Sequence, residues 1–484
     1  MSTGRAPSDD RQIPTPVRLA FGAGAIADGC KNAGFDVFLG LYYVTVLGLP
    51  GTLSGFALLL ALLVDAVSDP LVGSISDNFR SKWGRRHPFM ICAAVPMGLC
   101  FFALFAPPAG LSESQLFAWL LVFSVATRIS LTLYKVPADA LGPEMTDHYD
   151  ERTTLMSIRW AMGLGGGIAL QVVGWLFFFE DRATIAEGRL DLDNFPAFGV
   201  FIGLVVAVSI LIGTFGTASV IPKLSRVAET TRFSARRFVE GLRAALGSHS
   251  LRVLLGAAIL SQTAAGVAEV LGVYMSTWFW GFDSDRMALL AGFTAIPVVL
   301  AVVAARRVSI LVGDKRKTFI QLAIALIVWA PLAVIARLLD LAPTNDSDWI
   351  VPFVVAHTSV LMFVVVQLVI LTSSMIMDVT DEVALLSGER HEGIVMSTLS
   401  FAGKCTSGLG NFVGLSTLQW IGFPSGDAAA IDAVPEQTIL WLGLVAGPGL
   451  VVFYGAALVM VQRLRLTRAR YEEIQAELAN RPAS

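Results

Sequence analysis

The sequence has little charge for its length. Asp, Glu, Lys and Arg make up 15% of the 484 residues, whereas a soluble domain carries about 25%. Hydrophobic residues make up 55%, and the mean hydropathy is +0.68. This composition excludes an ordinary soluble enzyme and predicts an integral membrane protein. The net charge is only −3, so nothing in the bulk composition favours a nucleic-acid partner.

Cysteines and enzyme motifs are also scarce. No CxxC spacing occurs, so we interpret the cysteines as small core residues rather than disulfide partners or metal ligands; they are Cys30, Cys92, Cys100 and Cys405. HExxH, GxSxG and Walker A patterns are absent, which predicts no enzymatic activity and no cofactor. The polar segment Met1–Pro16 has no apolar core, so we expect no signal peptide.

Apolar segments long enough to span a membrane recur along the whole chain. A spanning helix needs about 20 apolar residues, and by that rule we predict about twelve spans. They lie near residues 17–46, 53–77, 88–107, 114–140, 155–179, 195–221, 250–280, 287–312, 317–339, 350–377, 392–421 and 437–462. The glycine runs 163–167 and 408–410 fall inside such segments, and we expect them to be close helix-packing sites.

The longest polar stretch between spans divides the chain in two. We predict an all-α membrane protein with an N-terminal six-helix bundle (1–221), a central cytoplasmic loop (222–250), a C-terminal six-helix bundle (251–463) and a cytoplasmic tail (464–484) containing an amphipathic helix. Basic residues gather at 80–86, 223–243, 306–317 and 463–470, so both termini are expected to be cytoplasmic. The similar charged runs after the second and eighth spans favour parallel repeats, with the solute site near the midplane between them.

A pair of carboxylates lies inside the second span. Asp65 and Asp69 are four residues apart, and Ser68 joins them on one helix face. Carboxylates within a spanning segment are energetically costly and usually face an interior site or a water cavity. Pro70 perturbs the helix there and would free backbone carbonyls. We predict a binding site for Na⁺ or H⁺; the alternative is a pair of salt bridges between helices.

Further polar residues lie inside other spans and predict the wall of a solute cavity. One stripe of the fourth span carries several of them, and the alternative is interhelical pairing. The candidates for solute binding are Asp28, Lys31, Asp36, Arg128, Lys135, Asp139, Arg159, Glu269 and Lys404. Counting Asp65 and Asp69, six acids face five bases, which leaves one negative charge for one bound cation.

Charged residues near the cytoplasmic ends of the spans predict a gate. Ion pairs among them would form when the inner side is closed and break when it opens. The candidates are Asp77, Arg80, Arg85, Arg86, Glu144, Arg152 and Arg390, with Glu151 and the acidic residues of 389–392 as further partners. The alternative is that the basic members only satisfy the positive-inside rule.

The second span and the loop after it resemble a known family. The runs 65–73 and 80–89 look like the glycoside–pentoside–hexuronide:cation symporters, the melibiose-permease-like branch of the major facilitator superfamily. The likeness extends over nearly the whole chain, including 21–25, 136–141, 150–153 and 388–393. It implies twelve helices and alternating access. It also implies that Asp65, Ser68, Asp69 and Thr132 occupy cation-site positions, with Arg159 and Lys404 near the sugar.

Two departures from that family bear on the solute. Galactoside-binding members carry an Asp at each of the positions that are Gly29 and Lys135 here. Lys135 near Arg159 and Lys404 would favour an anionic solute, such as a uronide or a sulfonated sugar. Alternatively, Lys135 neutralises Asp65 or Asp69 and weakens cation coupling.

These patterns together predict a cation-coupled symporter of a sugar-like solute in the bacterial inner membrane. The expected partners are a small-molecule solute, the coupling cation and the lipid bilayer, and the expected functional unit is a monomer. A transporter of an amphipathic solute such as a lysolipid, or of an exported metabolite, is the first alternative. A membrane receptor without transport is the second, and the density of charge inside the spans argues against it.

Overall fold

The computed structural model describes residues 13–146, 148–181, 188–223, 247–312, 314–387, 408–425, 434–464, 471, 473–474 and 477. Within these ranges the secondary structure is entirely helical, as predicted. The chain forms two compact units. Unit 1 comprises Met1–Tyr42 and Leu60–Phe233, and unit 2 comprises Tyr43–Leu59 and Ser234–Ser484. The predicted domain boundaries at 221, 250 and 463 stay predictions.

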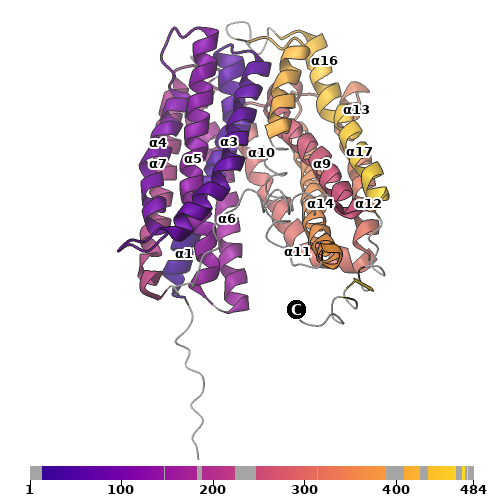
Figure 1. Ribbon diagram of the computed structural model, residues 1–484. Coiled ribbons are helices and arrows are strands. Elements are labelled where there is room, and N and C mark those ends of the chain that lie inside the picture. Colours follow the sequence, from indigo (N-terminus) through magenta and orange to yellow (C-terminus); the bar gives the residue numbers. More distant parts are fainter. Residues whose placement is uncertain are drawn as a thin grey trace, which may run out of the picture. The chain divides into compact units, whose positions relative to one another are not determined.

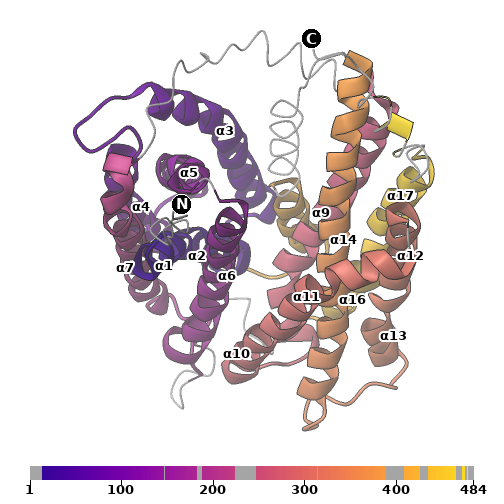
Figure 2. The same ribbon diagram turned by 90° about the horizontal axis from the view of Figure 1, so that it is seen from below.

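Unit 1 is a helical bundle in which α5 has neighbours on several sides (Figures 1 and 2). Its helices are α1 (Thr15–Ala23), α2 (Ile26–Ala33), α4 (His87–Phe105), α5 (Glu113–Met145), α6 (Tyr149–Val173), α7 (Asn194–Gly216) and most of α3 (Gly51–Asn78). π-helical turns at Gly34–Leu39 and Leu41–Val46 follow α2, another at Gly174–Phe178 follows α6, and a 3₁₀ turn, Ala218–Lys223, follows α7. Helix α4 packs against α5 and α7, and α2 packs against α6.

Unit 2 also consists of helices, several of which are interrupted. They are α9 (His249–Tyr274), α10 (Ser284–Phe293), α11 (Ala295–Val312), α12 (Lys315–Trp329), α13 (Leu332–Leu338), α14 (Ile350–Ser387), α16 (Glu436–Leu444) and α17 (Leu450–Gln462), with π-helical turns at Met275–Phe279 and Val445–Gly449. Proline explains two of the breaks, because it has no N–H for the carbonyl four residues earlier. Pro297 follows the junction of α10 and α11, and Pro331 separates α12 from α13. Asp283 and Asp314 cap the helices that follow them.

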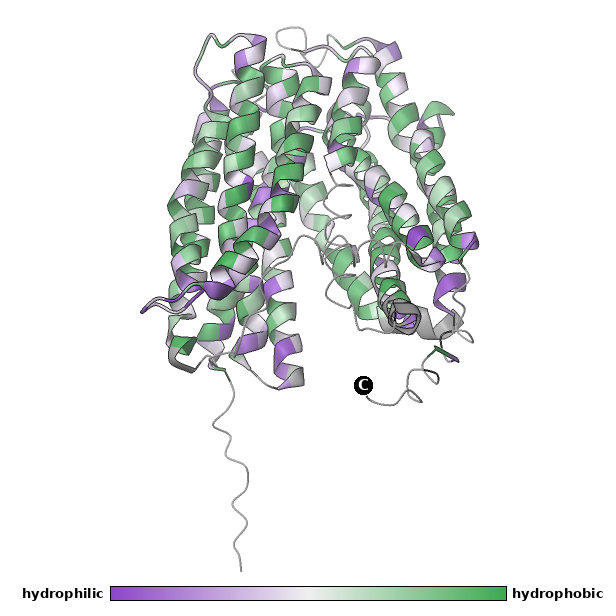
Figure 3. Cartoon of the chain, in the orientation of Figure 1, coloured by the Kyte–Doolittle hydropathy of each residue, from purple (hydrophilic) through white to green (hydrophobic). Residues whose placement is uncertain are grey.

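Ten helical segments in the described part of the chain are long and apolar enough to span a membrane. Each matches one predicted span to within several residues, and Figure 3 shows helices that are hydrophobic over most of their length. The predicted span 17–46 is interrupted between α1 and α2. The predicted span 392–421 lies partly outside the described residues. The number twelve, the repeats and the cytoplasmic termini therefore remain predictions.

Close helix packing explains the glycine run of α6. A Cβ atom on Gly29 of α2 would lie 1.8 Å from the carbonyl oxygen of Gly163 and 2.9 Å from the nitrogen of Gly167. A Cβ on Gly166 would meet Ile26 of α2 at 2.9 Å. In unit 2, a Cβ on Gly410 would lie 2.8 Å from Cα of Gly266. The interpretation of both glycine runs as packing sites is therefore confirmed at these positions.

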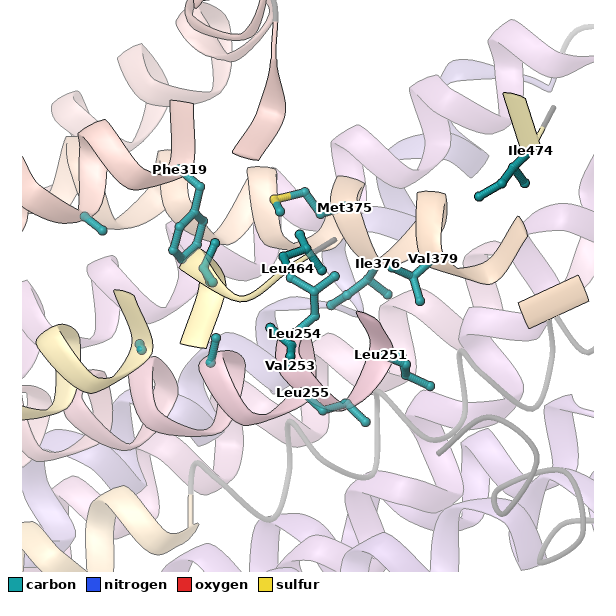
Figure 4. Close-up of a cluster of buried hydrophobic side chains, with 14 residues drawn as sticks. Leu251, Val253, Leu254, Leu255, Phe319, Met375, Ile376, Val379, Leu464 and Ile474 are labelled. Carbon is teal, nitrogen blue, oxygen red and sulfur yellow. The ribbon is translucent and has the colours of Figure 1, made fainter. Parts of the chain in front are cut away.

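A hydrophobic cluster joins the helices of unit 2 to the C-terminal tail. Leu251, Phe319, Met375 and Val379 are among its buried members, and the tail residue Ile474 is fully buried in it (Figure 4). The ring of Tyr471 also lies 6.0 Å from Lys315 Nζ. Two apolar residues of the amphipathic helix predicted for the tail thus pack against other helices of unit 2.

Candidate functional site

Three oxygen-bearing side chains from two helices meet in unit 1. Thr132 Oγ1 on α5 lies 2.8 Å from Asp65 Oδ1 and 2.9 Å from Asp69 Oδ1, both on α3. A hydroxyl has one proton, so it can donate to only one of the two carboxylates at a time. The four-residue spacing of the acids presents both to the same point of α5. The result is a set of converging oxygens, which hard cations prefer as ligands.

Ser68 does not join that set. Its hydroxyl donates to the backbone carbonyl of Asp65 at 3.1 Å, a local bond along its own helix. Helix α3 continues through Pro70, so the predicted perturbation is not a break. Pro70 nevertheless has no N–H for the carbonyl of Ala66, which leaves one further oxygen next to the carboxylates.

The charged side chains beside this oxygen set are mostly paired. Lys135 Nζ lies 2.5 Å from Asp28 Oδ2, and Arg159 Nη2 lies 2.8 Å from Asp139 Oδ1. Arg128 Nη1 is farther from its nearest acid, at 3.9 Å from Asp65 Oδ2. Lys135 therefore neutralises Asp28, and the cation facing Asp65 is Arg128.

Several of these charges are accessible although they belong to apolar spans. The exposed fractions of the side chains are 42% for Lys135, 29% for Asp28 and 48% for Asp139. Exposed charge within a spanning segment is tolerated where it faces water or protein rather than hydrocarbon. These exposures are compatible with the polar cavity wall predicted for the fourth span, which stays a prediction.

Aromatic rings lie against the guanidinium groups of Arg128 and Arg159, and the sequence did not predict these contacts. The Arg159 guanidinium lies 5.0 Å from the centroid of Phe21 and 6.0 Å from that of Tyr134. The Arg128 guanidinium lies 5.2 Å from the centroid of Phe35. The hydroxyl of Tyr134 fits there because Gly24 has no side chain. A Cβ atom on Gly24 would lie only 1.6 Å from that hydroxyl. Small residues that leave room for a buried tyrosine are the sequence signal that could have indicated these contacts.

The remaining solute candidates divide between the units. Lys31 lies on α2 and Asp36 in the π-helical turn after it, so both belong to unit 1. Glu269 lies on α9 of unit 2, and Lys404 and Arg390 lie outside the described residues. In unit 1, the five candidate carboxylates face four candidate cations, which again leaves one negative charge. The acids are Asp28, Asp36, Asp65, Asp69 and Asp139, and the bases are Lys31, Arg128, Lys135 and Arg159.

Most of the predicted gate residues meet at one end of α5. Arg86 Nη2 lies 2.6 Å from Glu144 Oε1 and 3.3 Å from Asp77 Oδ1, and Arg85 also binds Glu144. Burial lowers the pKa of Arg86, and Glu144 and Asp77 oppose that shift, so the two carboxylates stabilise the charged guanidinium. Arg80 is exposed. A similar contact occurs in unit 2, where Lys315 at the start of α12 binds Asp378 of α14 at 2.7 Å.

Glu151, a predicted gate partner, takes part in a separate cluster. It accepts hydrogen bonds from the backbone of Ile13 at 2.6 Å and from Thr146 at 2.6 Å, and it pairs with Arg18 at 2.9 Å. Arg152 donates to the backbone carbonyl of Thr146 at 2.9 Å. These contacts tie the start of α1 to the connection between α5 and α6.

The sequence is similar to those of several transporters, and to one of them along nearly the whole chain. The putative glycoside/cation symporter YagG of Escherichia coli is 23% identical over 479 residues, which is 98% of this chain and 96% of the relative. An uncharacterized symporter of Synechocystis is 36% identical over 157 residues, 31% of this chain and 29% of that relative's length. The isoprimeverose transporter of Lactiplantibacillus pentosus is 24% identical over 194 residues, 36% of this chain and 40% of the relative.

The fold is similar to solved transporter structures. The xylose transporter XylE of Escherichia coli matches with a TM-score of 0.60 at 14% identity, covering 95% of this chain and 99% of XylE. The nucleoside transporter NupG matches with a TM-score of 0.58 at 14% identity, covering 95% of this chain and 98% of NupG. The family model described as MFS/sugar transport protein matches residues 20–468. The chain therefore belongs to the MFS/sugar transport protein family of the major facilitator superfamily, and is a multi-pass membrane transporter rather than an enzyme.

Proposed function

We propose that the protein uses alternating access to couple the transport of a sugar-like solute to a cation across the bacterial inner membrane. The observation that carries this proposal is the convergence of Asp65, Asp69 and Thr132 in unit 1. The name of the relative YagG, a putative glycoside/cation symporter, supports the same solute class and the same coupling.

The oxygen set suits one monovalent cation. Two carboxylates and a hydroxyl supply part of the shell that Na⁺ requires, and the carbonyl of Ala66 is close in sequence. A proton is the other candidate, because the carboxylates of Asp65 and Asp69 face the same hydroxyl and one of them could hold it. The single excess negative charge of unit 1 is compatible with either ion.

The paired charges beside the oxygen set suit the hydroxyl groups of a sugar. The Lys135–Asp28 and Arg159–Asp139 pairs each offer donors and acceptors on accessible side chains. Lys135 contacts Asp28. This contact argues against the alternative in which Lys135 neutralises Asp65 or Asp69 and weakens cation coupling. No described contact favours the lysolipid or receptor hypotheses.

Uptake into proteoliposomes tests this function directly. Purified protein is reconstituted, and radiolabelled melibiose, xylose, galactose and glucuronate are each offered under an inward Na⁺ gradient, a pH gradient or neither. We expect at least one solute to accumulate several-fold above equilibrium under one gradient and only to equilibrate without it. Equal uptake under all three conditions for every solute would contradict the proposal. Empty liposomes are the control.

The Glu144 cluster makes alternating access testable. Glu144→Gln removes the carboxylate shared by Arg85 and Arg86 and leaves Arg86 with Asp77. Breaking one partner of a buried ion pair is strongly destabilising, so we expect a melting temperature several degrees lower and uptake reduced about 10-fold. Glu113→Gln, at the other, exposed end of α5, is the matched control. Unchanged uptake by Glu144→Gln would show that the cluster is not a gate.

A further inference from the structure

A hollow of about 550 Å³ lies between three helical segments of unit 2. Its walls come from α9, from the helical residues 408–420, and from α16 and α17 with the π-helical turn between them. Val267 of α9, which is buried, contributes to its lining. We call this hollow the α9–α17 groove. None of its lining residues is a candidate for cation or solute binding.

The π-helical turn Val445–Gly449 explains why the space is not filled. Gly449 lines the groove and brings no side chain to it. The atoms nearest to a Cβ at this position belong to Leu444 and Val445 of the same segment. Gly449 has a φ of −60°, which any residue adopts, so backbone conformation does not require a glycine here. The hollow is therefore a property of the sequence in this interrupted helix.

The lining of the groove is almost entirely apolar. Among the described residues that form it, none is charged. The hydroxyl of Thr417 donates to the backbone carbonyl of Val413 at 2.8 Å, so it is already satisfied within its own helix. The hydroxyls of a sugar or the backbone of an extended peptide would lack partners in such a place, and that is costly within the hydrocarbon region. A hydrocarbon chain has no such requirement.

The two ends of the groove lie at different depths of the spanning segment. Trp420 and Trp441 line one end, and they are 68% and 49% exposed. Exposed tryptophans of spanning helices gather at the level of the lipid headgroups. Leu450 and Phe453 line the other end, near the middle of the apolar segment Glu436–Gln462. The groove therefore runs from the headgroup level towards the centre of the bilayer.

The length of the groove matches one leaflet. Phe453 follows Trp441 by twelve positions, which is about 18 Å at the α-helical rise of about 1.5 Å per residue. The hydrocarbon core of a bilayer is about 30 Å thick, so one leaflet contributes about 15 Å. An acyl chain anchored at the headgroup level would thus extend along the whole groove.

We propose that the α9–α17 groove binds one acyl chain of a phospholipid whose headgroup lies at the level of Trp420 and Trp441. The indole N–H groups can donate to the ester or phosphate oxygens of that lipid. Because the surrounding lipid is as apolar as the groove, the hydrophobic effect does not favour the bound chain. Binding depends instead on the van der Waals contacts that an unfilled hollow would forfeit. The lipid is a structural ligand of the interrupted helix and is not transported.

Photochemical cross-linking of the full chain in proteoliposomes of phosphatidylethanolamine and phosphatidylglycerol tests the proposal. The probe is phosphatidylethanolamine with a diazirine either near the end of one acyl chain or on the headgroup, and labelled residues are mapped by mass spectrometry. We expect the acyl probe to label Leu450 and Phe453 several-fold more than Val452, although Val452 is the more exposed residue of the same helix. The headgroup probe is expected to label Trp420 and Trp441 instead. A free fatty acid with the same diazirine distinguishes a phospholipid from a loose chain.

Variants that fill the groove assign the labelling to it. Val445→Phe and Val413→Phe add a ring from opposite walls, and each is expected to reduce labelling of Phe453 by the acyl probe several-fold. Val459→Phe adds the same ring at an exposed position of α17 that does not line the groove, and it should leave labelling unchanged. Size-exclusion chromatography shows whether each variant is folded. If neither filling variant folds, the labelling of the unaltered chain by the two phospholipid probes decides.

Four results would overturn the proposal. They are equal labelling of Leu450 and Val452 by the acyl probe; labelling that both folded filling variants leave intact; stronger labelling of the groove by the free fatty acid than by the phospholipid; and labelling of the groove that is weaker than that of Val452. The last result would mean that another protein surface, such as a second copy of the chain, covers the groove. Coupled uptake of a solute is measured separately, so either proposal can fail without the other.

Discussion

Asp69→Asn is expected to abolish cation-dependent transport while the protein remains folded. Asn preserves the size of the side chain and an oxygen that can accept from Thr132, which lies 2.9 Å from Asp69 Oδ1. The substitution removes the one negative charge by which acids exceed bases among the candidate residues of unit 1. A unit charge about 4 Å from the bound ion contributes about 4 kcal/mol at an intermediate dielectric. We therefore expect cation affinity to fall by a factor on the order of 100 or more.

Asp69 is a cleaner position for this test than Asp65. Asp65 also faces Arg128 at 3.9 Å, so Asp65→Asn would alter an ion pair as well as the oxygen set. Thr132 contributes a neutral oxygen, and its removal would change affinity by less than the loss of a carboxylate.

Two transport modes separate the expected loss from misfolding. Accumulation of solute under an imposed Na⁺ or pH gradient should disappear in Asp69→Asn, whereas solute exchange at equal concentrations on both sides should persist. Asp193→Asn, an exposed change in the same unit, should retain both activities. If Asp69→Asn accumulates solute with unaltered dependence on the gradient, the assignment of the cation site is wrong.

The parts of this site that the sequence predicted are those determined by local periodicity. Asp65 and Asp69 share a helix face because they are four residues apart, and Arg128, Thr132, Lys135 and Asp139 follow one stripe for the same reason. Ten predicted spans match helices because the length of an apolar run is itself a local property. The side chains of α3 and α5 could therefore be placed near the site before any contact was known.

The pairing of the charges could not be predicted in this way. Lys135 lies one turn from Thr132, which favoured a contact with Asp65 or Asp69, but Asp28 on α2 is closer. That choice depends on how near α2 approaches α5, and on residues 107 positions apart in the sequence. The hydrogen bond from the Ser68 hydroxyl to the backbone carbonyl of Asp65 could not be predicted from its helix face either, and its role as a cation ligand stays a prediction. Tyr134 was missed because the space for its hydroxyl exists only where Gly24 approaches it.

Gly29→Asp is expected to destabilise the fold strongly, although it introduces an acid that galactoside-binding members of the family carry at this position. A Cβ on Gly29 would lie 1.8 Å from the carbonyl oxygen of Gly163 and 2.9 Å from the nitrogen of Gly167. Both contacts are with backbone atoms of α6, so no change of rotamer can relieve them. Overpacking of ordinary cores costs about 1–3 kcal/mol, and a backbone overlap of this size should exceed that range.

The expected defect is caused by the first side-chain carbon, so Gly29→Ala should show it as well. Gly165→Ala is the matched control, because a Cβ there meets nothing within 4 Å and alanine favours a helix. Size-exclusion chromatography after heating should give a melting temperature at least several degrees lower for Gly29→Ala than for Gly165→Ala. Equal melting temperatures would contradict the close contact of α2 with α6. If the contact is as described, the missing acid is a consequence of helix packing. Recognition of the solute must then depend on side chains other than the one at position 29, such as Asp28, Lys31 and Arg128.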